Sequence, residues 1–417
     1  MSICEILSVG TEILLGDILN TNCRFLSRAL ADMGISVLYH ETVGDNEQRL
    51  ADALERALGR SDIVITTGGL GPTPDDITRD VCTKAFGYEL EFRPELARQI
   101  EEYFTRAGRK MADSNLRQAY APKEATVFRN YNGTAPGLGM KKDGKCLVLL
   151  PGPPFEAEPM FRQSVVPFLE EYRTCTIVSH QVRTIGIGES TMAQIAGELL
   201  DGENPTVAPY CKTGEAYLRV SARAQNKEEA DLLCAPVIEE LKKRLGDYVY
   251  GIDIEGVEQA VVPLLKEANL TVATAESCTA GFIAKRITDV PGASAVFKHG
   301  IITYANEVKE KALGVSPETL ALHGAVSEET AREMAQGVRK VTGADIGLSV
   351  TGFAGPDSDE EGKAPGLIYT ALDAPGVTLC EKIETGRNDR DYNRFVAASR
   401  ALNLLRRYLT SKPHQGG

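Results

Sequence analysis

Short apolar segments and amphipathic segments alternate along the first 150 residues of the chain. Four apolar runs predict buried strands at residues 3–9, 35–42, 62–66 and 146–150. Apolar positions recur every three or four residues in the stretches between them, which predicts helices ending near residue 33 and at 47–58, 79–86, 94–108 and 114–119. This alternation favours right-handed crossovers and a parallel sheet, whose ligands bind at the carboxyl ends of the strands.

The pattern changes after residue 171. Residues 172–252 predict the order strand, helix, two strands and helix, at 176–185, 189–200, 207–210, 216–224 and 227–245. This order is typical of an open two-layer α+β sandwich, and a linker at 251–256 follows it. The remainder predicts a second α/β unit, with strands at 270–274, 301–304, 344–350, 366–372 and 377–385 and helices at 257–268, at 282–287, from 305 and through residue 394. An acidic loop at 357–362 interrupts this last unit.

Composition limits the classes of function. The chain has 417 residues, enough for about three domains, and its net charge of −12 argues against a broad nucleic-acid-binding surface. No run approaches the ~20 apolar residues that span a bilayer, so we expect no membrane segment. The nine cysteines are scattered and contain no Cys-x-x-Cys pair, which is typical of reduced thiols and of a cytoplasmic protein.

Two loops of the N-terminal unit, residues 10–17 and 67–78, follow predicted strands and combine glycines with carboxylates. Glycines let a backbone approach a phosphate closely and present amides to it. The carboxylates are Glu12, Asp17, Asp75 and Asp76. Oxygen ligands grouped beside a phosphate suit Mg²⁺ or a similar hard ion. The alternative is that Asp75 and Asp76 only cap the next helix. A third strand-end loop, residues 151–156, is expected to form a wall of the same site.

A strand-to-helix turn at residues 275–281 is the feature around which the C-terminal unit is organised. Such a turn directs free backbone N–H groups and the positive end of the helix dipole at whatever lies there. Ser277 is placed where a nucleophile or an anion-holding hydroxyl would be useful. The residues alone leave open the alternative that Ser277 or Thr279 only caps the helix.

A serine nucleophile needs a base. His299 and His323 are the histidines of this region, and neither falls in a loop that looks like a site. Lys309 lies one turn into the helix that begins near residue 305, where it can face the strand end. A desolvated lysine can lose its proton near neutrality and act as the base. Most lysines on such helices face solvent, and position alone favours that alternative.

Two further features of the C-terminal unit suit an anionic substrate. The loop at 351–356 follows a strand, and its glycines let amides point inward, as an oxyanion or phosphate site requires. Arg390 and Arg394 are spaced i,i+4 near the start of the last helix, which suggests a clamp for a phosphate. The alternative is a solvated charged face, paired for example with Asp391.

The N-terminal loops resemble those of the molybdopterin-binding fold. They look most like the N-terminal domain of the CinA (competence/damage-inducible) family, which implies a three-layer α/β domain at 1–171. The resemblance implies hydrolysis of ADP-ribose to AMP and ribose 5-phosphate. It implies a divalent metal (Mg²⁺, Mn²⁺ or Co²⁺) on the four carboxylates Glu12, Asp17, Asp75 and Asp76. The implied ligand contacts are Gly10, Thr11, Asn20, Thr67, Gly68, Gly69, Gly71, Pro151 and Gly152.

The same family has a K-homology-like middle domain, which the resemblance places at 172–252. A nucleic-acid-binding version has a basic Gly-x-x-Gly loop. This chain instead has Gly186-Ile187-Gly188-Glu189. We therefore expect a structural or dimer-forming domain, no direct contact with nucleic acid, and a homodimer.

Residues 253–417 look like the C-terminal CinA domain, an α/β domain. The matching motifs are Ala275-Glu276-Ser277-Cys278-Thr279, Ile302-Thr303-Tyr304-Ala305-Asn306 with Lys309, Thr351-Gly352-Phe353-Ala354-Gly355-Pro356, and the two arginines. The resemblance implies a metal-free amidohydrolase that converts nicotinamide mononucleotide (NMN) to nicotinate mononucleotide and ammonia. The family pattern has glycine where this chain has Ala280, and Gly-Thr-Val where it has Gly366-Leu367-Ile368.

In the implied scheme Ser277 attacks the carboxamide, Lys309 moves the proton and Tyr304 positions the lysine or the amide. Backbone amides near Ser277 and Thr351 hold the oxyanion, and Arg394 holds the phosphate, with Arg390 as a candidate second contact. The NMN contacts implied are Glu276, Cys278, Thr279, Asn306, Thr351, Gly352, Ala354, Gly355, Arg390 and Arg394. The alternative function is a non-catalytic nucleotide- or molybdopterin-binding accessory protein linked to competence or DNA damage.

Overall fold

The computed structural model describes residues 2–356 and 364–411. The acidic loop predicted at 357–362 lies outside these residues. The chain divides into two compact units. The first contains Met1–Val178 and Arg223–Ala230, and the second contains Ser179–Ala222 and Asp231–Gly417.

A six-stranded sheet forms the centre of the first unit. Its strands are β1 (Ile3–Val9), β2 (Ser36–Val43), β3 (Ile63–Thr67), β6 (Thr126–Phe128), β7 (Gly137–Lys142) and β8 (Lys145–Leu150), and β4 (Glu91–Phe92) and β5 (Tyr120–Ala121) pair separately. The order is β2-β1-β3-β8-β7-β6. β2, β1, β3 and β8 are parallel to one another, whereas β7 pairs antiparallel with β8 and β6 pairs antiparallel with β7. The predicted parallel sheet is confirmed, with an antiparallel edge.

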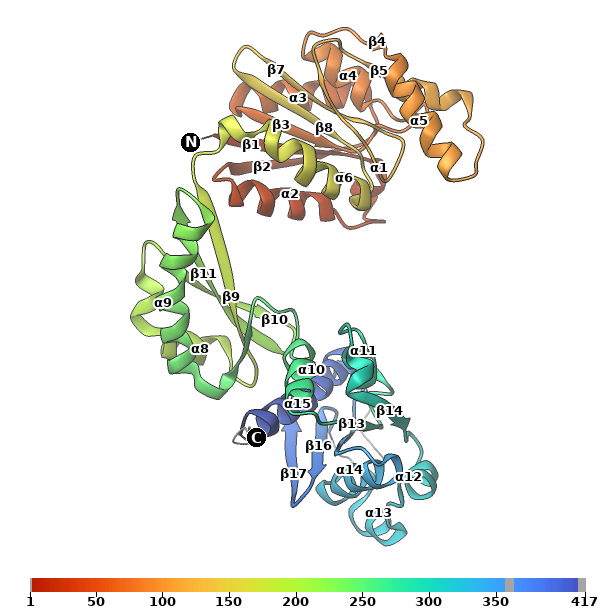
Figure 1. Cartoon of the computed structure of the whole chain (residues 1–417), viewed down its shortest axis with the longest axis vertical. Coiled ribbons are helices and arrows are strands. Elements are labelled where there is room, and N and C mark those ends of the chain that lie inside the picture. Colours follow the sequence, from red (N-terminus) through yellow and green to blue (C-terminus); the bar gives the residue numbers. More distant parts are fainter. Residues whose placement is uncertain (1, 357–363, 412–417) are drawn as a thin grey trace. The chain divides into compact units, whose positions relative to one another are not determined.

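Helices cover both faces of this sheet (Figure 1). They are α1 (Thr11–Leu15), α2 (Thr21–Asp32), α3 (Glu47–Arg60), α4 (Thr78–Ala85), α5 (Pro94–Arg106), α6 (Pro154–Met160) and α7 (Val166–Phe168). Successive residues of a strand point to opposite faces. Leu7 accordingly joins the apolar cluster that contains Leu50 of α3, and Ile6 joins the cluster that contains Leu26 of α2. The unit is therefore a three-layer α/β domain, as the sequence predicts.

The middle domain has one strand more than its sequence pattern predicts. Its elements are β9 (Thr176–Thr184), α8 (Glu189–Ala196), β10 (Thr206–Lys212), β11 (Glu215–Ala224), α9 (Lys227–Leu245) and β12 (Val249–Ile252). The strands form one sheet in the order β10-β11-β9-β12. The linker predicted from residue 251 therefore begins too early, because β12 continues to Ile252 in antiparallel pairing with β9.

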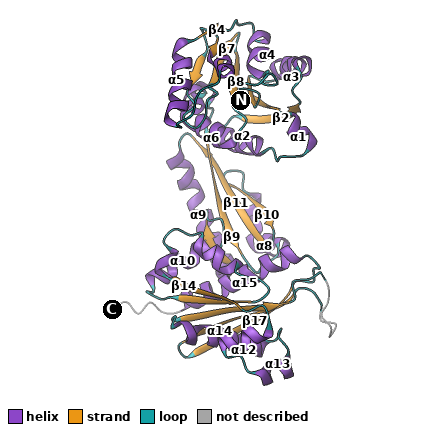
Figure 2. Ribbon diagram, turned by 90° about the vertical axis from the view of Figure 1, so that its right-hand side faces the viewer, coloured by secondary structure: helices purple, strands orange, loops and turns teal. Residues whose placement is uncertain are grey.

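The C-terminal domain is built on a five-stranded sheet. The strands are β13 (Val272–Glu276), β14 (Phe297–Ile302), β15 (Ile346–Gly352), β16 (Leu367–Ala374) and β17 (Val377–Glu384). The helices are α10 (Glu258–Glu267), α11 (Phe282–Thr288), α12 (Asn306–Leu313), α13 (Pro317–His323), α14 (Glu328–Thr342) and α15 (Arg390–Ser411). The order is β14-β13-β15-β16-β17, parallel through β15 and antiparallel beyond it. Figure 2 shows this sheet between α10 and α15 on one side and α12–α14 on the other, so the predicted α/β class is confirmed.

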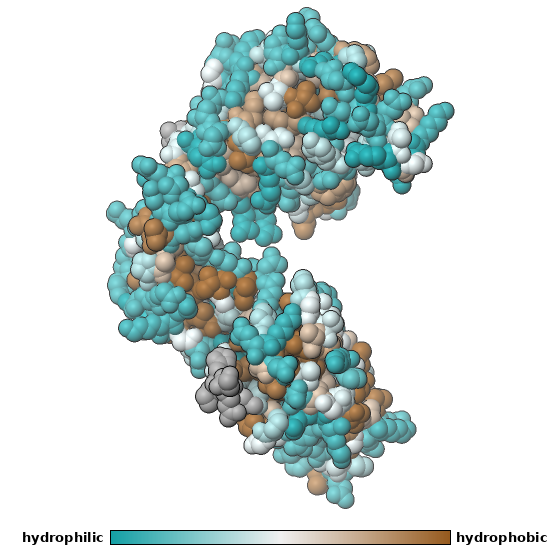
Figure 3. Space-filling view, in the orientation of Figure 1, coloured by the Kyte–Doolittle hydropathy of each residue, from teal (hydrophilic) through white to brown (hydrophobic). Residues whose placement is uncertain are grey.

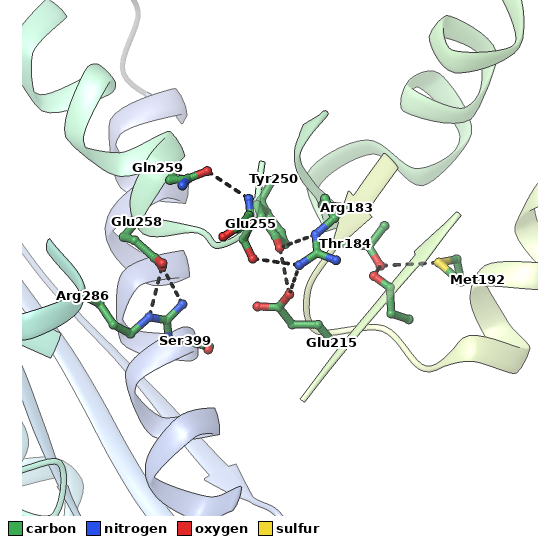
Figure 4. A network of polar contacts seen from close by, with 11 residues as sticks. Arg183, Thr184, Met192, Glu215, Tyr250, Glu255, Glu258, Gln259, Arg286 and Ser399 are labelled. Atoms are coloured by element: carbon green, nitrogen blue, oxygen red, sulfur yellow. Dashed lines mark hydrogen bonds and ion pairs between the residues drawn. The ribbon is translucent and has the colours of Figure 1, made fainter. Parts of the chain in front are cut away.

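A buried polar network joins the middle sheet to the C-terminal domain within the second unit (Figure 4). Arg183 of β9 is 1% exposed and donates hydrogen bonds to Glu215 (3.2 Å) and to the hydroxyl of Tyr250 (3.0 Å). Arg286 of α11 pairs with Glu258 of α10 at 2.6 Å. The bond that crosses between the two domains runs from Nη2 of Arg183 to the carbonyl of Glu255 (2.8 Å), whereas the pairs Arg183–Glu215 and Arg286–Glu258 each lie within one domain.

A histidine on β9 lies between two aspartates. Nε2 of His180 is 2.9 Å from Asp231, and Nδ1 is 2.5 Å from Asp253. Burial by itself lowers the pKa of His180, but its hydrogen bonds to the carboxylates of both aspartates, with their negative charges, raise it overall. The protonated ring therefore ties α9 and the start of the C-terminal domain to the middle sheet.

Hydrophilic residues predominate on the face of the molecule shown in Figure 3. Apolar residues form smaller separate areas there. Among the helices of the described residues, none has both the length and the apolar character needed to cross a bilayer.

Candidate functional site

Residues 277–281 connect β13 to α11, as the apolar pattern predicts. Glu276 ends β13 and is 1% exposed, and its carboxylate accepts the N–H groups of Gly281 (2.9 Å), Ile283 (3.1 Å) and Ala284 (2.8 Å). Gly281 occupies the helix N-cap position, so neither Ser277 nor Thr279 caps α11. The structure assigns Glu276 to holding this turn and not to the predicted NMN contact.

The turn brings Ser277 against a buried lysine. Lys309, the fourth residue of α12, is 1% exposed, and its Nζ lies 3.3 Å from Oγ of Ser277. The same Nζ lies 2.8 Å from the carbonyl oxygen of Thr303 and 3.2 Å from that of Tyr304. The alternative of a solvent-facing lysine is therefore wrong. The sequence prediction that Lys309 turns back toward the strand end is confirmed.

The surroundings of Lys309 favour its neutral form. Burial lowers its pKa, and the nearby Cys278 thiol opposes this only in part. A neutral amine has two N–H donors and one lone pair, so Nζ in that form can donate to the two carbonyls and accept the proton of the Ser277 hydroxyl. Burial also raises the pKa of Cys278 to about 12, which removes its thiol as a competing nucleophile.

The structure places the side chains of Tyr304 and Asn306 at the exposed edge of the site. Tyr304 is 62% exposed and contacts Lys309 through its carbonyl, while its hydroxyl lies 3.5 Å from Nη2 of Arg390. The main chain of Tyr304, and not its ring, therefore positions the lysine. Asn306 begins α12 and is exposed at the rim of the site.

Of the predicted residues in this region, Thr351 and Gly352 end β15, and Ala354 and Gly355 lie in the loop that follows it. Thr351 is buried, and its hydroxyl donates to the carbonyl of Ala325 at 2.6 Å. The carbonyl of Gly355 accepts a hydrogen bond from Nη1 of Arg390 at 2.8 Å. Thr351 therefore fixes the loop, and its side chain is not directed to a ligand.

Both predicted arginines lie at the site, but two nitrogens of Arg394 already donate hydrogen bonds to backbone carbonyls. Its Nε donates to the carbonyl of Cys278 at 3.1 Å, and its Nη2 donates to that of Thr279 at 2.9 Å. These two bonds hold the Ser277 turn from the side of α15. Arg390 is exposed, so its guanidinium remains accessible to an anion.

Two backbone amides of the turn remain for an oxyanion. The N–H of Ser277 donates to the carbonyl of Val350 at 3.0 Å and is not free. The N–H groups of Cys278 and Thr279 reach no backbone carbonyl within the described chain. At nucleophile turns of this kind, the amide after the nucleophile usually contributes to the oxyanion hole.

The strand-end loops of the first unit line a separate pocket of about 650 Å³. The predicted residues on its wall are Gly10, Glu12, Asn20, Thr67, Gly68, Gly69, Gly71, Asp75, Asp76, Pro151 and Gly152. Thr11 and Asp17 do not line it. The three loops that the sequence assigned to one site therefore do converge.

The glycine loop of this pocket is suited to anions. The Cβ of any other residue at Gly68, whose φ is +105°, would lie 2.1 Å from the carbonyl oxygen of Val9. The N–H of Gly68 donates to Leu150, whereas those of Gly69 and Gly71 reach no backbone carbonyl in the described residues. Unpaired amides in a glycine loop form an anion-binding concavity.

The charged side chains that line the pocket among the described residues are all acidic. Its described lining includes five carboxylates and no lysine, arginine or histidine. The five are Glu12, Asp45, Asp75, Asp76 and Glu156. An anionic ligand would be repelled here unless it brought cations with it.

Three of the four carboxylates predicted as metal ligands line the pocket, but they form no cluster of three or more ligands among the described residues, and their role as metal ligands stays a prediction. Asp17 lies off the pocket wall, and Asp76 accepts the N–H of Thr73 at 2.9 Å. The capping alternative fails, because α4 begins after Ile77 without a side-chain cap. Glu12 and Asp75 remain as hard oxygen donors that fit a divalent ion arriving with its substrate.

Two other predicted contacts have structural roles. The N–H and hydroxyl of Thr11 both donate to Asp45, at 3.0 and 2.8 Å. Asn20 caps α2 by accepting the N–H of Cys23 at 3.1 Å, and its amide donates to Ser8 at 2.8 Å. These hydrogen bonds stabilise the conformation of the first loop and of the start of α2.

Several residues of the pocket wall had no individual predicted role, among them Asn22, Asp45 and Glu156. Asn22 joins two loops, since its Nδ2 donates to Thr67 and to the carbonyl of Gly152, both at 2.7 Å. Asp45 follows the predicted strand at 35–42, and the strand-end rule used for the other loops could have found it. Glu156 lies in the third loop, residues 151–156, but no motif there indicated a role for this residue.

Comparisons with known proteins match the whole chain. Three family models match, described as "Probable molybdopterin binding domain" (5–171), "Damage-inducible protein CinA KH domain" (179–251) and "CinA C-terminal domain" (254–409). A CinA-like protein of Kosmotoga olearia is 47% identical over 406 residues, covering 97% of this chain and 98% of its own. A CinA-like protein of Dictyoglomus turgidum is 48% identical over 407 residues, covering 97% and 99%. A competence/damage inducible protein of Agrobacterium tumefaciens, solved by crystallography, is 36% identical over 38% of this chain and 98% of its own, with a TM-score of 0.35.

Proposed function

Because this chain belongs to the CinA family, we propose that its C-terminal site is an NMN amidohydrolase built on Ser277 and Lys309. The observation that carries the proposal is the buried Lys309, 3.3 Å from the Ser277 hydroxyl. No carboxylate is among the groups that perturb its pKa. An ion pair would keep the lysine protonated, whereas burial alone favours the neutral base.

In the proposed reaction, Oγ of Ser277 attacks the carboxamide carbon of NMN while its proton passes to Nζ of Lys309. Lys309 then returns the proton to the amide nitrogen, the C–N bond breaks and ammonia leaves. Water attacks the resulting ester of Ser277 with the same lysine as base, which releases nicotinate mononucleotide. The amides of Cys278 and Thr279 stabilise the oxyanion of each tetrahedral intermediate.

Arg390 is the principal phosphate contact in this proposal. It is exposed and lies at the loop after β15, and its hydrogen bond to Gly355 is compatible with a second, ionic contact. Arg394 contributes mainly by holding the turn, because two of its nitrogens already donate to Cys278 and Thr279. We therefore expect Arg390 to affect substrate affinity and Arg394 to affect turnover.

The test is ammonia release from NMN by the full chain. Ser277→Ala should abolish release without lowering the unfolding temperature, because within the described residues the hydroxyl makes a hydrogen bond to Lys309 and to no other group. Ser294→Ala, at an exposed position outside the site, is the matched control and should leave release unchanged. Undiminished release from Ser277→Ala would end the proposal.

We propose further that the N-terminal pocket hydrolyses ADP-ribose to AMP and ribose 5-phosphate. The molybdopterin-binding fold supplies the glycine loop, whose unpaired amides suit a diphosphate. The carboxylate lining supports a requirement for divalent ions, since it offers no basic side chain to balance a diphosphate. When bound, the ion would neutralise developing phosphate charge, and Glu12 and Asp75 would hold it.

The corresponding test measures AMP release and binding of ADP-ribose with Mg²⁺, Mn²⁺ or Co²⁺. Asp75→Asn should weaken ADP-ribose binding in the presence of the ion, while Asp17→Asn, off the pocket wall, should not. NMN hydrolysis should persist in both variants. Saturable binding without AMP would contradict the pyrophosphatase and favour a nucleotide-binding protein at this site.

A further inference from the structure

Glu156 is a carboxylate of the N-terminal pocket that no motif or predicted role accounts for. It lies in the first turn of α6, is half-buried and lines the pocket with the glycine loop. Its Oε2 accepts a hydrogen bond from Nδ2 of Asn130 at 2.6 Å. Its Oε1 has no hydrogen-bond partner within the described chain, so one oxygen is held and the other is free.

The loop before β7 is shaped around this carboxylate. A Cβ at Gly133 would lie 2.2 Å from Oε2 and 2.7 Å from Oε1 of Glu156, so a larger residue there would displace the carboxylate from this position. Asn130 is itself held, because it donates to the carbonyl of Ala135 at 2.9 Å and accepts the N–H of Asn132 at 3.0 Å. The orientation of Glu156 is therefore fixed by a neutral amide.

No cation balances Glu156 among the described residues, and the pocket wall that it shares is lined by carboxylates. Burial raises its pKa, and the hydrogen bond from Asn130 offsets this only in part. A half-buried acid without a counter-charge opposes folding, and such groups concentrate at functional sites. The other carboxylates that face the pocket are Glu12, Asp45, Asp75 and Asp76.

We propose that Glu156 is the general base that activates water in the N-terminal pocket, an inference that rests on the diphosphate hydrolysis proposed above. Water forms a bond to one phosphorus of the diphosphate, and its proton passes to the free Oε1 of Glu156. The bridging P–O bond breaks, and its electron pair leaves with the departing phosphate ester. Glu156 then loses the proton to solvent.

Glu156→Gln tests this role with little change of shape, since the amide oxygen of glutamine can still accept from Asn130. We expect kcat for AMP release to fall at least ~100-fold, as loss of a general base usually produces. The dissociation constant of ADP-ribose with Mg²⁺, measured by calorimetry, should stay within about threefold. Glu158→Gln, two residues along α6 and off the pocket wall, is the matched control and should leave both quantities unchanged.

The outcomes separate this inference from the function on which it rests. Wild-type protein that releases no AMP would overturn both. An active wild type with a Glu156→Gln variant of equal kcat would overturn the base and leave the pyrophosphatase standing. Loss of ADP-ribose binding with unchanged kcat would also overturn it, because Glu156 would then be a ligand contact. Asn130→Ala should lower kcat less than Glu156→Gln does, since it frees the carboxylate without removing it.

Discussion

Replacing Lys309 by methionine isolates the proposed base from every other part of the C-terminal site. Methionine has nearly the length of lysine and keeps the apolar stem in place, but it removes the nitrogen. That nitrogen is the group 3.3 Å from Ser277 and within 3.2 Å of two carbonyl oxygens. The variant therefore leaves Ser277, the turn and the arginines unchanged and deletes only the proton acceptor.

The expected loss is large in turnover and small in binding. A positioned general base usually contributes about 10²–10⁴ in rate, which corresponds to about 3–5 kcal/mol of activation free energy. Lys309 is 1% exposed and has no surface to offer a phosphate or ribose. We therefore expect kcat for ammonia release to fall by that factor while KM changes less than about threefold.

Stability should change little, because two effects of the substitution oppose each other. The carbonyls of Thr303 and Tyr304 lose a donor, which costs about 1–3 kcal/mol for each group left buried and unpaired. The folded state also no longer carries a buried amine, and the penalty for burying that polar group is removed. We expect the free energy of unfolding to change by less than about 2 kcal/mol, so the protein remains folded for assay.

The assay follows ammonia release from NMN as a function of pH. Because only the neutral amine accepts a proton and burial lowers the pKa of Lys309, wild-type kcat/KM should rise with pH through a pKa below that of a free lysine. This rise should be absent in Lys309→Met. Lys311→Met is the matched control, since Lys311 lies on the same helix, is exposed and contacts only Glu307 at 3.8 Å.

A double substitution provides the decisive comparison. If Ser277 and Lys309 act as one unit, the Ser277→Ala/Lys309→Met protein should be no slower than Ser277→Ala alone. Losses that multiply would show that the two residues act separately. A raised KM with normal kcat in Lys309→Met would refute the base and make the lysine a binding group.

Three other predictions concern the turn and the middle domain. Arg394→Ala should lower kcat more than it raises KM, with a loss of about 1–3 kcal/mol in unfolding free energy, because the turn carbonyls lose a charged donor; unchanged turnover would show that the turn holds itself. Ala280→Gly should stabilise the protein by up to about 1 kcal/mol in thermal unfolding, because φ at Ala280 is +50°; a lower unfolding temperature would contradict this. His180→Asn should narrow the difference in unfolding temperature between pH 6 and pH 9. The pKa of His180 is raised in the folded state, so the stability it contributes is full below about pH 6.5 and is lost as the pH rises through the folded-state pKa. An unchanged dependence of the unfolding temperature on pH would show that the flanking aspartates do not bind a charged ring.

The elements that position the sites follow from local pattern, whereas some of their partners do not. Buried strands such as β3 and β8 are continuous apolar runs, and periodicity alone identifies them. The helices α13 and α14 were not predicted, although Ser316 and Ser327 cap them with side-chain hydrogen bonds. The edge strand β12 was also missed, because four residues have too little pattern to distinguish a strand from a linker.

Site roles were predictable where they depend on position in the chain and not where they depend on long-range packing. Ser277 follows a strand and precedes a helix, so its place on the turn could be read from the sequence. The burial of Lys309 could not, because it depends on how α12 packs beside the end of β14. Glu276 is the converse case: it was expected to bind ligand, and in the structure its carboxylate accepts the N–H groups of Gly281, Ile283 and Ala284 at the start of α11, which the sequence pattern did not indicate.

The two proposed bases share an arrangement that explains how a fold tolerates them. Lys309 is held by carbonyl oxygens and Glu156 by a carboxamide, and neither has an opposite charge beside it. A charged partner would orient each group equally well, but it would also fix the charged form and so move the pKa of lysine up and that of glutamate down. A neutral partner orients the reacting atom without stabilising the charged form of the group by an opposite charge. The stability lost by burying a group without its counter-charge is therefore the same physical term that lowers the pKa of Lys309 and raises that of Glu156.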